Sequence, residues 1–298
     1  MLNNKKVNLF KNYCDVGGYS LPADFPYIAP SFLDELKVLP FKERVKRAYL
    51  FITERNAENL NFSKIDEDEG ASLLAFDDCL ASLDLTEGKT ASYSDYFFDD
   101  SDFFGKVSSI MCLYISTYLD LVNSAIVDAY ESVNFSVPTF DGVFAIALYI
   151  LKRIGLPINT IICPIEKFFD YAIKGVFLSN YLKEECDEVI YEFFNEFGYL
   201  FDEISSSTII AIDEYYDSYE DEKFTITTKI LSPYYNSRSI YKTLTGKNEI
   251  SIDKAILKLY EESAESIPPY IKDEKNHFYT APISLDFHTA FSIIKSAN

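Results

Sequence analysis

A strand, a helix and a second strand follow one another near the middle of the sequence, and they constrain the fold more than any other feature. Residues 133–137 are β-branched and aromatic, and residues 144–154 form an apolar stretch of helical length. Gly155 and Pro157 then stand where a helix ends. Residues 158–163 are a second candidate for a buried strand. This succession predicts a βαβ unit, and hence a parallel sheet with a right-handed crossover.

The turn between the first strand and the helix has the position of a phosphate-binding loop without its usual composition. In many α/β enzymes the free N–H groups at such a helix start bind a phosphate, and glycines let the anion approach. Here one glycine stands among two aromatic residues and a negative charge, so we expect no phosphate to bind. The turn consists of Phe140, Asp141, Gly142, Val143 and Phe144.

The segment 137–158 resembles the threonine synthases, which are fold-type II enzymes that use pyridoxal phosphate (PLP). The family has Val-Pro-Thr-Gly-Asn-Phe-Gly-Asn at this place, and its glycine-asparagine loop holds the PLP phosphate. In this chain Phe140 and Val143 take the glycine places. Asp141 and Phe144 take the asparagine places. The resemblance therefore implies a relic of the phosphate loop and no cofactor-binding residues.

A second segment, 83–95, is similar to the family segment that carries the Schiff-base lysine. The family's lysine falls on Ser94. Loss of that amine removes the covalent link to PLP and the usual proton shuttle at the α-carbon of the substrate. The resemblance thus implies no catalytic residue here, only a relic position with Thr90 and Asp95 as neighbours. The identical positions are Leu83, Leu85, Gly88, Thr90 and Asp95.

Three weaker matches keep the family's chain order, and one family segment is missing. The weaker matches are residues 17–22, 111–121 and 285–290, the last of which contains His288. The family has a Ser/Thr-Gly-Asp-Thr-Gly loop between the lysine and the aromatic helix, but here only residues 96–109 fill that interval. The resemblance implies that most of one lobe of the cleft is deleted.

The fold that follows is α/β. The resemblance implies a reduced fold-type II PLP-enzyme core with a parallel sheet, preceded by a helical N-terminal lobe like that of threonine synthase. We expect residues 1–80 to form the lobe and residues 81–298 to form the truncated core. A helix rich in basic residues, 42–47, should present a solvated face. Residues 221–230 are similar to a family turn that leads into a helix.

Hydrophobic periodicity adds the remaining elements. We expect one further strand at residues 207–212. The expected helices are 31–38, 41–55, 71–80, 107–132, 165–177, 182–197, 251–263 and 287–295.

Charge and cysteine content exclude several classes of function. With 47 acidic and 27 basic residues the net charge is −20, which disfavours binding to nucleic acid or to an anionic membrane. The five cysteines are odd in number and widely spaced, as expected for reduced thiols in a cytoplasmic protein. We find neither a signal peptide nor an apolar segment long enough to span a bilayer.

Other chemical candidates have ordinary structural explanations. The two histidines, His277 and His288, cannot be joined by sequence alone to a nucleophile or an orienting group. Lys89 could supply a displaced amine, but a turn lysine beside Glu87 is more typical of the surface. The acidic run 66–69 lacks the spacing of a metal-binding loop, and we expect no metal site.

The sequence predicts a threonine synthase-like protein, and the resemblance implies an origin in amino-acid biosynthesis. We expect the protein to be a pseudoenzyme with a binding or regulatory role. It should bind no cofactor, and its partner would be a second copy of itself or an intact threonine synthase. One alternative is an active PLP-dependent lyase that converts phosphohomoserine to threonine with a displaced lysine. The other is a decaying paralogue without a selected role. The residues leave the role of His288 and any ligand undecided.

Overall fold

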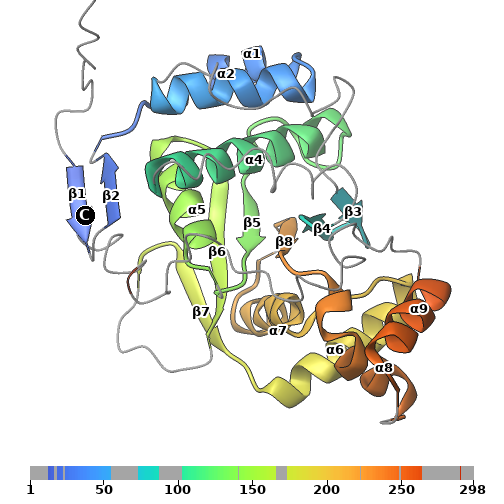
Figure 1. Ribbon diagram of the computed structural model, residues 1–298. Helices are drawn as coiled ribbons and strands as arrows, with labels where there is room; N and C mark the ends of the chain where they lie inside the picture. The colour runs from blue at the N-terminus through green and yellow to red at the C-terminus, as the bar shows by residue number, and fades with distance from the viewer. Residues whose placement is uncertain are drawn as a thin grey trace, which may run out of the picture.

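The centre of the molecule is a six-stranded sheet with helices on both faces (Figure 1). The computed structural model describes residues 13–16, 19–22, 24–54, 73–86, 103–139, 141–165, 173–221, 223–247, 250–263 and 289. The strand order is β3-β4-β8-β5-β6-β7, and every neighbouring pair except β3–β4 is parallel. Its strands are β3 (Leu73–Ala75), β4 (Leu80–Asp84), β5 (Val133–Ser136), β6 (Ile158–Ile165), β7 (Val176–Asn180) and β8 (Thr225–Lys229). The predicted parallel α/β fold is confirmed.

Helices account for most of the remaining described chain. A separate antiparallel pair, β1 (Tyr13–Val16) with β2 (Tyr19–Pro22), precedes them. A 3₁₀ turn, η3 (Pro233–Asn236), follows β8. The helices are α1 (Pro30–Lys37), α2 (Phe41–Thr53), α4 (Phe103–Asn123), α5 (Val143–Ile154), α6 (Lys183–Phe197), α7 (Glu203–Ser218), α8 (Ser237–Thr245) and α9 (Ile252–Glu262).

The predicted βαβ unit is present as β5, α5 and β6. Strands β5 and β6 are parallel neighbours, and α5 crosses between them. Gly155 ends α5 at φ 113°, and its N–H donates to Leu151 O at 3.1 Å. A Cβ at this position would come within 2.7 Å of Ile28 O, so both the backbone conformation and the close approach of residue 28 require glycine.

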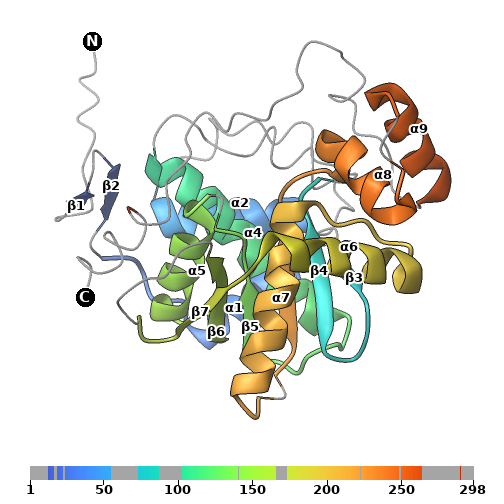
Figure 2. The same ribbon diagram turned by 90° about the horizontal axis from the view of Figure 1, so that it is seen from below.

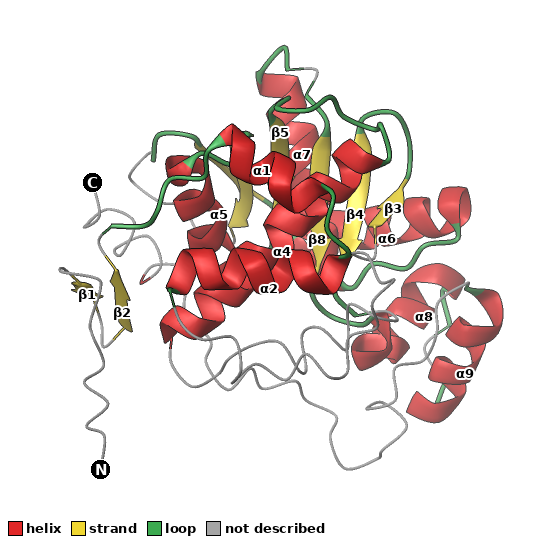
Figure 3. Cartoon of the chain, turned by 90° about the horizontal axis from the view of Figure 1, so that it is seen from above, coloured by secondary structure: helices red, strands yellow, loops and turns green. Residues whose placement is uncertain are grey.

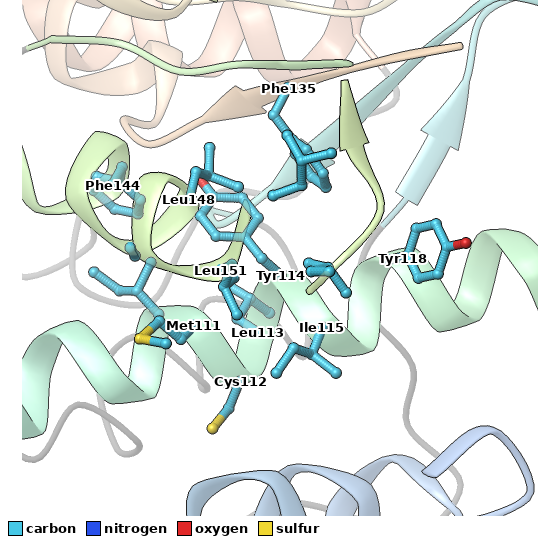
Figure 4. Close-up of a cluster of buried hydrophobic side chains, with 14 of the residues drawn as sticks. Met111, Cys112, Leu113, Tyr114, Ile115, Tyr118, Phe135, Phe144, Leu148 and Leu151 are labelled. Atoms are coloured by element: carbon cyan, nitrogen blue, oxygen red, sulfur yellow. The ribbon is translucent and has the colours of Figure 1, made fainter. Parts of the chain in front are cut away.

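Helix α4 is the core of one layer. It lies between the sheet and the pair α1–α2, and nearly all of its residues are buried (Figures 1 and 3). Figure 4 shows Met111 and Tyr114 of α4 facing Phe144 and Leu148 of α5 and Phe135 of β5. One apolar cluster therefore joins α1, α2, α4, α5 and one face of the sheet.

The other face of the sheet carries α7, with α6 beside it (Figure 2). Alternation along β6 shows how a strand serves both layers: Ile161 and Cys163 belong to the α4 cluster, whereas Ile162 belongs to the cluster of α6 to α9. Both faces are covered, and the two strands in the middle of the sheet, β5 and β8, are buried along their whole length. The boundary between an N-terminal lobe (residues 1–80) and a core (residues 81–298) stays a prediction.

The expected helix 71–80 is wrong. Its described part, residues 73–80, contributes β3, a turn and the first residue of β4. Asp77 Oδ1 accepts from the backbone N–H groups of Cys79 and Leu80, at 2.7 and 2.8 Å, and this closes the turn. Pairing of β4 with β8, distant in sequence, decides the outcome.

Three further boundaries differ from expectation. Helix α4 ends at Asn123 rather than residue 132, because Ala125 takes a left-handed conformation, φ 55°. Residues 165–177 do not form one helix, since Ile165 ends β6 and Val176 begins β7. The segment 221–230 leads into β8, a strand. The expected helix 287–295 lies outside the described residues, apart from Thr289.

The expected strand 207–212 is part of α7. Two of its hydroxyl groups donate hydrogen bonds to backbone carbonyls of the same helix. Ser207 Oγ donates to Ile204 O at 2.6 Å, and Thr208 Oγ1 donates to Ser205 O at 2.5 Å. This satisfies polar side chains on a helix that is pressed against the sheet.

The basic segment 42–47 is not uniformly solvated. Arg44 is 5% exposed, pairs with Asp120 of α4 and donates to Ser116 O at 3.2 Å. Its burial comes from the packing of α2 on α4, which a local charge pattern does not reveal. Lys42 and Lys46 remain partly exposed on the same helix, and Arg47 pairs with Glu35 at 2.8 Å on the surface.

Candidate functional site

The strand order places a topological switch between β5 and β8. From β5 the chain proceeds through α5 to β6 and β7 on one side, while α7, on the opposite face, leads to β8 on the other side. In open α/β sheets ligands bind outside the carboxyl ends of strands at such a point. Side chains at the starts of α4 and α5 are hydrogen-bonded to each other, and the first turn of α7 contacts the residue that follows β8. We therefore take this edge as the candidate site.

An ion pair lies at the start of α5. Lys106, in the second turn of α4, is 3% exposed, and its Nζ donates to Asp141 Oδ2 at 2.8 Å. The other oxygen, Asp141 Oδ1, accepts from Val143 N at 3.1 Å. A side-chain carboxylate therefore occupies an amide group at the helix start, where an external anion would bind in a phosphate loop.

The other described residues of the turn are also buried and leave the start of α5 covered by side chains. Phe144 is 7% exposed and belongs to the cluster of α4 and α5 shown in Figure 4. Gly142 is buried and has an ordinary right-handed conformation, φ −61°, that does not require glycine. Val143 is fully buried. Phe140 lies outside the described residues.

A second buried ion pair links β4 and β8 at their carboxyl ends. Asp84 and Lys229 are register partners, and Lys229 Nζ lies 3.0 Å from Asp84 Oδ2. Tyr199 donates its hydroxyl to the same oxygen at 2.9 Å, and its ring centroid lies 4.4 Å from Lys229 Nζ. Asp84 Oδ1 accepts from both the N–H and the hydroxyl of Thr86, each at 2.7 Å. Both carboxylate oxygens are thus hydrogen-bonded inside the protein.

Asp202 is a third carboxylate at this edge. It is 2% exposed and caps α7 by accepting from Ile204 N at 2.9 Å and Ser205 N at 3.1 Å through Oδ1. Its Oδ2 is buried and, within the described part of the chain, has no hydrogen-bond partner. Burial raises the pKa of Asp202 to about 6, against the lowering influence of these hydrogen bonds and of Lys229. The ionised form of this residue therefore costs folding energy.

Replacing Asp202 with asparagine should stabilise the protein at neutral pH. Because the pKa is higher in the folded state, from 3.8 to about 6, the native chain binds the extra proton and loses stability as pH rises through about 6. The loss amounts to about 3 kcal/mol. Asparagine keeps the helix cap without the charge. Urea unfolding should show a gain for the variant at pH 7.5 that shrinks towards pH 4. The exposed Asp253→Asn is the control, and an equal gain at both pH values would contradict the prediction.

The structure describes only some of the residues that the sequence nominated. Asp141, Gly142, Val143 and Phe144 lie together at the start of α5. The relic lysine position and the other nominated residues lie outside the described residues: Ser94, Thr90, Asp95, Lys89, Phe140, His277 and His288.

Sequence reasoning missed most of the charged groups at this edge. Lys106 stands in an apolar helix, and Asp84 and Lys229 end two strands whose pairing is not local. The one available signal was a charge at the carboxyl end of a buried strand. Within the described ranges no three His, Cys, Asp or Glu side chains form a group that could hold a metal ion. Cys79 is largely exposed. The partial burial of its thiol and the neighbouring Asp77 raise its pKa to about 11.

No family model matches the sequence, and no curated protein matches it. Solved structures do match. PLP-bound threonine synthase from Brucella melitensis is 12% identical, with TM-score 0.57 over 85% of this chain and 90% of that one. Threonine synthase from Escherichia coli is 10% identical, with TM-score 0.60 over 81% and 88%. The yeast enzyme is 12% identical, with TM-score 0.59 over 97% and 94%.

The chain has the threonine synthase fold. The expectation drawn from the two sequence segments is thereby confirmed for the architecture, including the fold-type II core. At this identity the likeness concerns the fold alone. No helix among the described residues is long and apolar enough to cross a membrane.

Proposed function

We propose that this threonine synthase-like protein has lost PLP catalysis and acts in binding or regulation, on its own or together with an intact threonine synthase. The Asp141 carboxylate carries this proposal. A phosphate entering the turn would have to displace a carboxylate that belongs to the same turn and already holds Lys106 and the Val143 N–H. Two anions at one helix start repel each other. The residues of the turn therefore do not fit the PLP phosphate.

The sequence supplies independent support. By the resemblance, serine stands at the Schiff-base lysine position, and the cofactor-domain loop has no counterpart in the sequence. A chain without the amine, the phosphate loop and that lobe retains the scaffold of the family but lacks three parts that PLP chemistry uses. We expect the missing lobe to leave apolar surface for a partner or a second copy.

One observation favours the alternative of an active enzyme with a displaced lysine. Lys106 and Lys229 are both buried lysines near the carboxyl edge of the sheet. A lysine nucleophile must be neutral, and it usually gains that state from an apolar or cationic environment. Each of these two instead faces a carboxylate at 3.0 Å or less, so the alternative has weaker support.

Incubation with PLP should leave the protein without a labelled lysine. The full chain is mixed with PLP, reduced with borohydride and digested, and the peptides are mapped by mass spectrometry. We expect no stoichiometric label and no threonine formed from phosphohomoserine. An intact threonine synthase treated in parallel is the positive control.

The mapped position would separate the alternatives. Stoichiometric label at Lys106 or Lys229, lost in the matching Lys→Met variant, would establish a displaced amine and overturn the proposal. Label spread over exposed lysines such as Lys42 or Lys254 at low yield would reflect ordinary surface chemistry. Threonine formation above the buffer rate would overturn the proposal whatever the labelling pattern.

A further inference from the structure

A pocket at the start of α8 is the feature that the proposed function leaves unexplained. It measures 450 Å³ and is lined by the end of η3, the first two turns of α8 and Ile252 of α9. Helices α8 and α9 lie together beside α6, away from the α4 layer (Figure 2). The pocket is thus distinct from the turn at Asp141.

The charge of the pocket is opposite to that of the protein. Arg238 and Lys242 both line it, and their spacing of four residues puts them on one face of α8. Like charges at this spacing repel each other by a few tenths of a kcal/mol. No carboxylate in the described ranges forms an ion pair with either side chain, although the chain carries a net charge of −20. A bound anion would remove the repulsion.

The start of α8 and the hydroxyl of Ser237 add to this electropositive pocket. The first turn of α8 contains no acidic residue, and the N-cap residue that precedes it, Asn236, makes no capping hydrogen bond with its side chain. Ser237, the next residue, lines the pocket, is 2% exposed and makes no side-chain hydrogen bond within the described part of the chain. This hydroxyl can donate a hydrogen bond to a ligand oxygen.

Glu203 contacts a lining residue of the pocket, and both of its carboxylate oxygens are already bound. Glu203 Oε1 accepts from the hydroxyl of Ser239 at 3.0 Å, and its other oxygen pairs with Lys183 at 3.0 Å. This acid therefore holds the pocket's Ser239 against the start of α7 and shares its charge with Lys183. Neither of its oxygens forms an ion pair with Arg238 or Lys242.

We propose that this pocket binds a small phosphate ester. The guanidinium of Arg238 can bind a phosphate with two parallel hydrogen bonds, while Lys242 adds a point charge and Ser237 a hydroxyl donor. The start of α8 favours the same negative group through its dipole. Tyr235 and Ile252 complete the lining with apolar surface, which a substituent on the phosphate would cover. This inference stands independently of the proposed function.

Calorimetric titration of the full chain with inorganic phosphate and with phenyl phosphate tests the proposal, with sodium chloride of equal ionic strength as the blank. We expect saturable binding of both, and tighter binding of phenyl phosphate. Arg238→Gln and Lys242→Gln should each weaken binding about tenfold or more. The matched control is Lys254→Gln on α9, an exposed lysine that does not line the pocket. Melting temperatures confirm that each variant is folded.

Three outcomes would overturn the proposal. Wild-type protein could show no saturable binding of either probe. Lys254→Gln could weaken binding as much as Arg238→Gln, which would mean diffuse attraction to charge. The protein could bind vesicles containing phosphatidic acid without binding phenyl phosphate, which would replace the small ester with a lipid headgroup. A failure of PLP labelling to follow expectation would not alter any of these results.

Discussion

Replacing Phe103 and Phe104 together with serine should leave the protein largely unfolded at room temperature. The two rings begin α4 and are 8% and 3% exposed, and Phe104 meets Phe25 edge to face at 5.9 Å. Loss of a buried phenylalanine costs about 3–5 kcal/mol, so the pair costs about 6–10 kcal/mol. That is comparable with the whole stability of a typical domain, about 5–15 kcal/mol. Circular dichroism in a urea series should show the loss.

The single variant Phe104→Ser keeps the result measurable if the double variant does not fold. Tyr260→Ser on α9 is the matched control, since that ring is 49% exposed and its loss should cost less than about 1 kcal/mol. If Phe103→Ser/Phe104→Ser melts at the wild-type temperature but changes the oligomeric state by light scattering, these rings form an interface rather than part of the core.

The central βαβ unit was predictable because its signals are local and agree with one another. The apolar run of α5, its glycine end and the strand on either side each indicate the same structure, and tertiary packing contradicts none of them. Helices α2, α6 and α9 were predictable for the same reason. Each has apolar residues at helical spacing on one face and polar residues on the other.

Failures occurred where long-range pairing or burial decided the structure. Strand β8 gains its place between β4 and β5 from partners that lie about a hundred residues away in the chain or more, and no short window records this. Helix α7 has Ser205, Ser206, Ser207 and Thr208 in sequence, which weakens any helical pattern. The helical conformation of α7 is stabilised by the Asp202 cap and by packing against the sheet.

The candidate site was half predictable. Asp141 was recognised because a carboxylate replaces an amide in a known kind of turn. Its partner Lys106 was not, because a lysine in an apolar run gives no sign that α4 will bring it to the start of α5. Asp84 and Lys229 follow the same rule: each is unremarkable in sequence, and only the parallel register of β4 and β8 makes them a pair.

Replacing Lys229 with methionine should destabilise the fold by about 3–5 kcal/mol, because it leaves Asp84 buried without its cation. The lysine is fully buried, Asp84 is 3% exposed, and the ammonium also lies over the Tyr199 ring. The double variant Lys229→Met/Asp84→Leu removes both charges and should recover part of that loss. Urea unfolding of Lys229→Met, Asp84→Leu and the double variant gives the coupling energy between the two side chains directly.

Comparison with an exposed ion pair shows whether the Asp84–Lys229 pair supports the fold. Lys183→Met breaks an ion pair whose lysine is 74% exposed, and it should cost less than about 1 kcal/mol. If Lys229→Met costs no more than this control, the pair does not support the fold, and a buried lysine at a topological switch point would instead be held there for a ligand. If the large cost is found and the double variant recovers stability, the charges of this edge neutralise each other. That outcome would support the proposal that this edge no longer binds PLP.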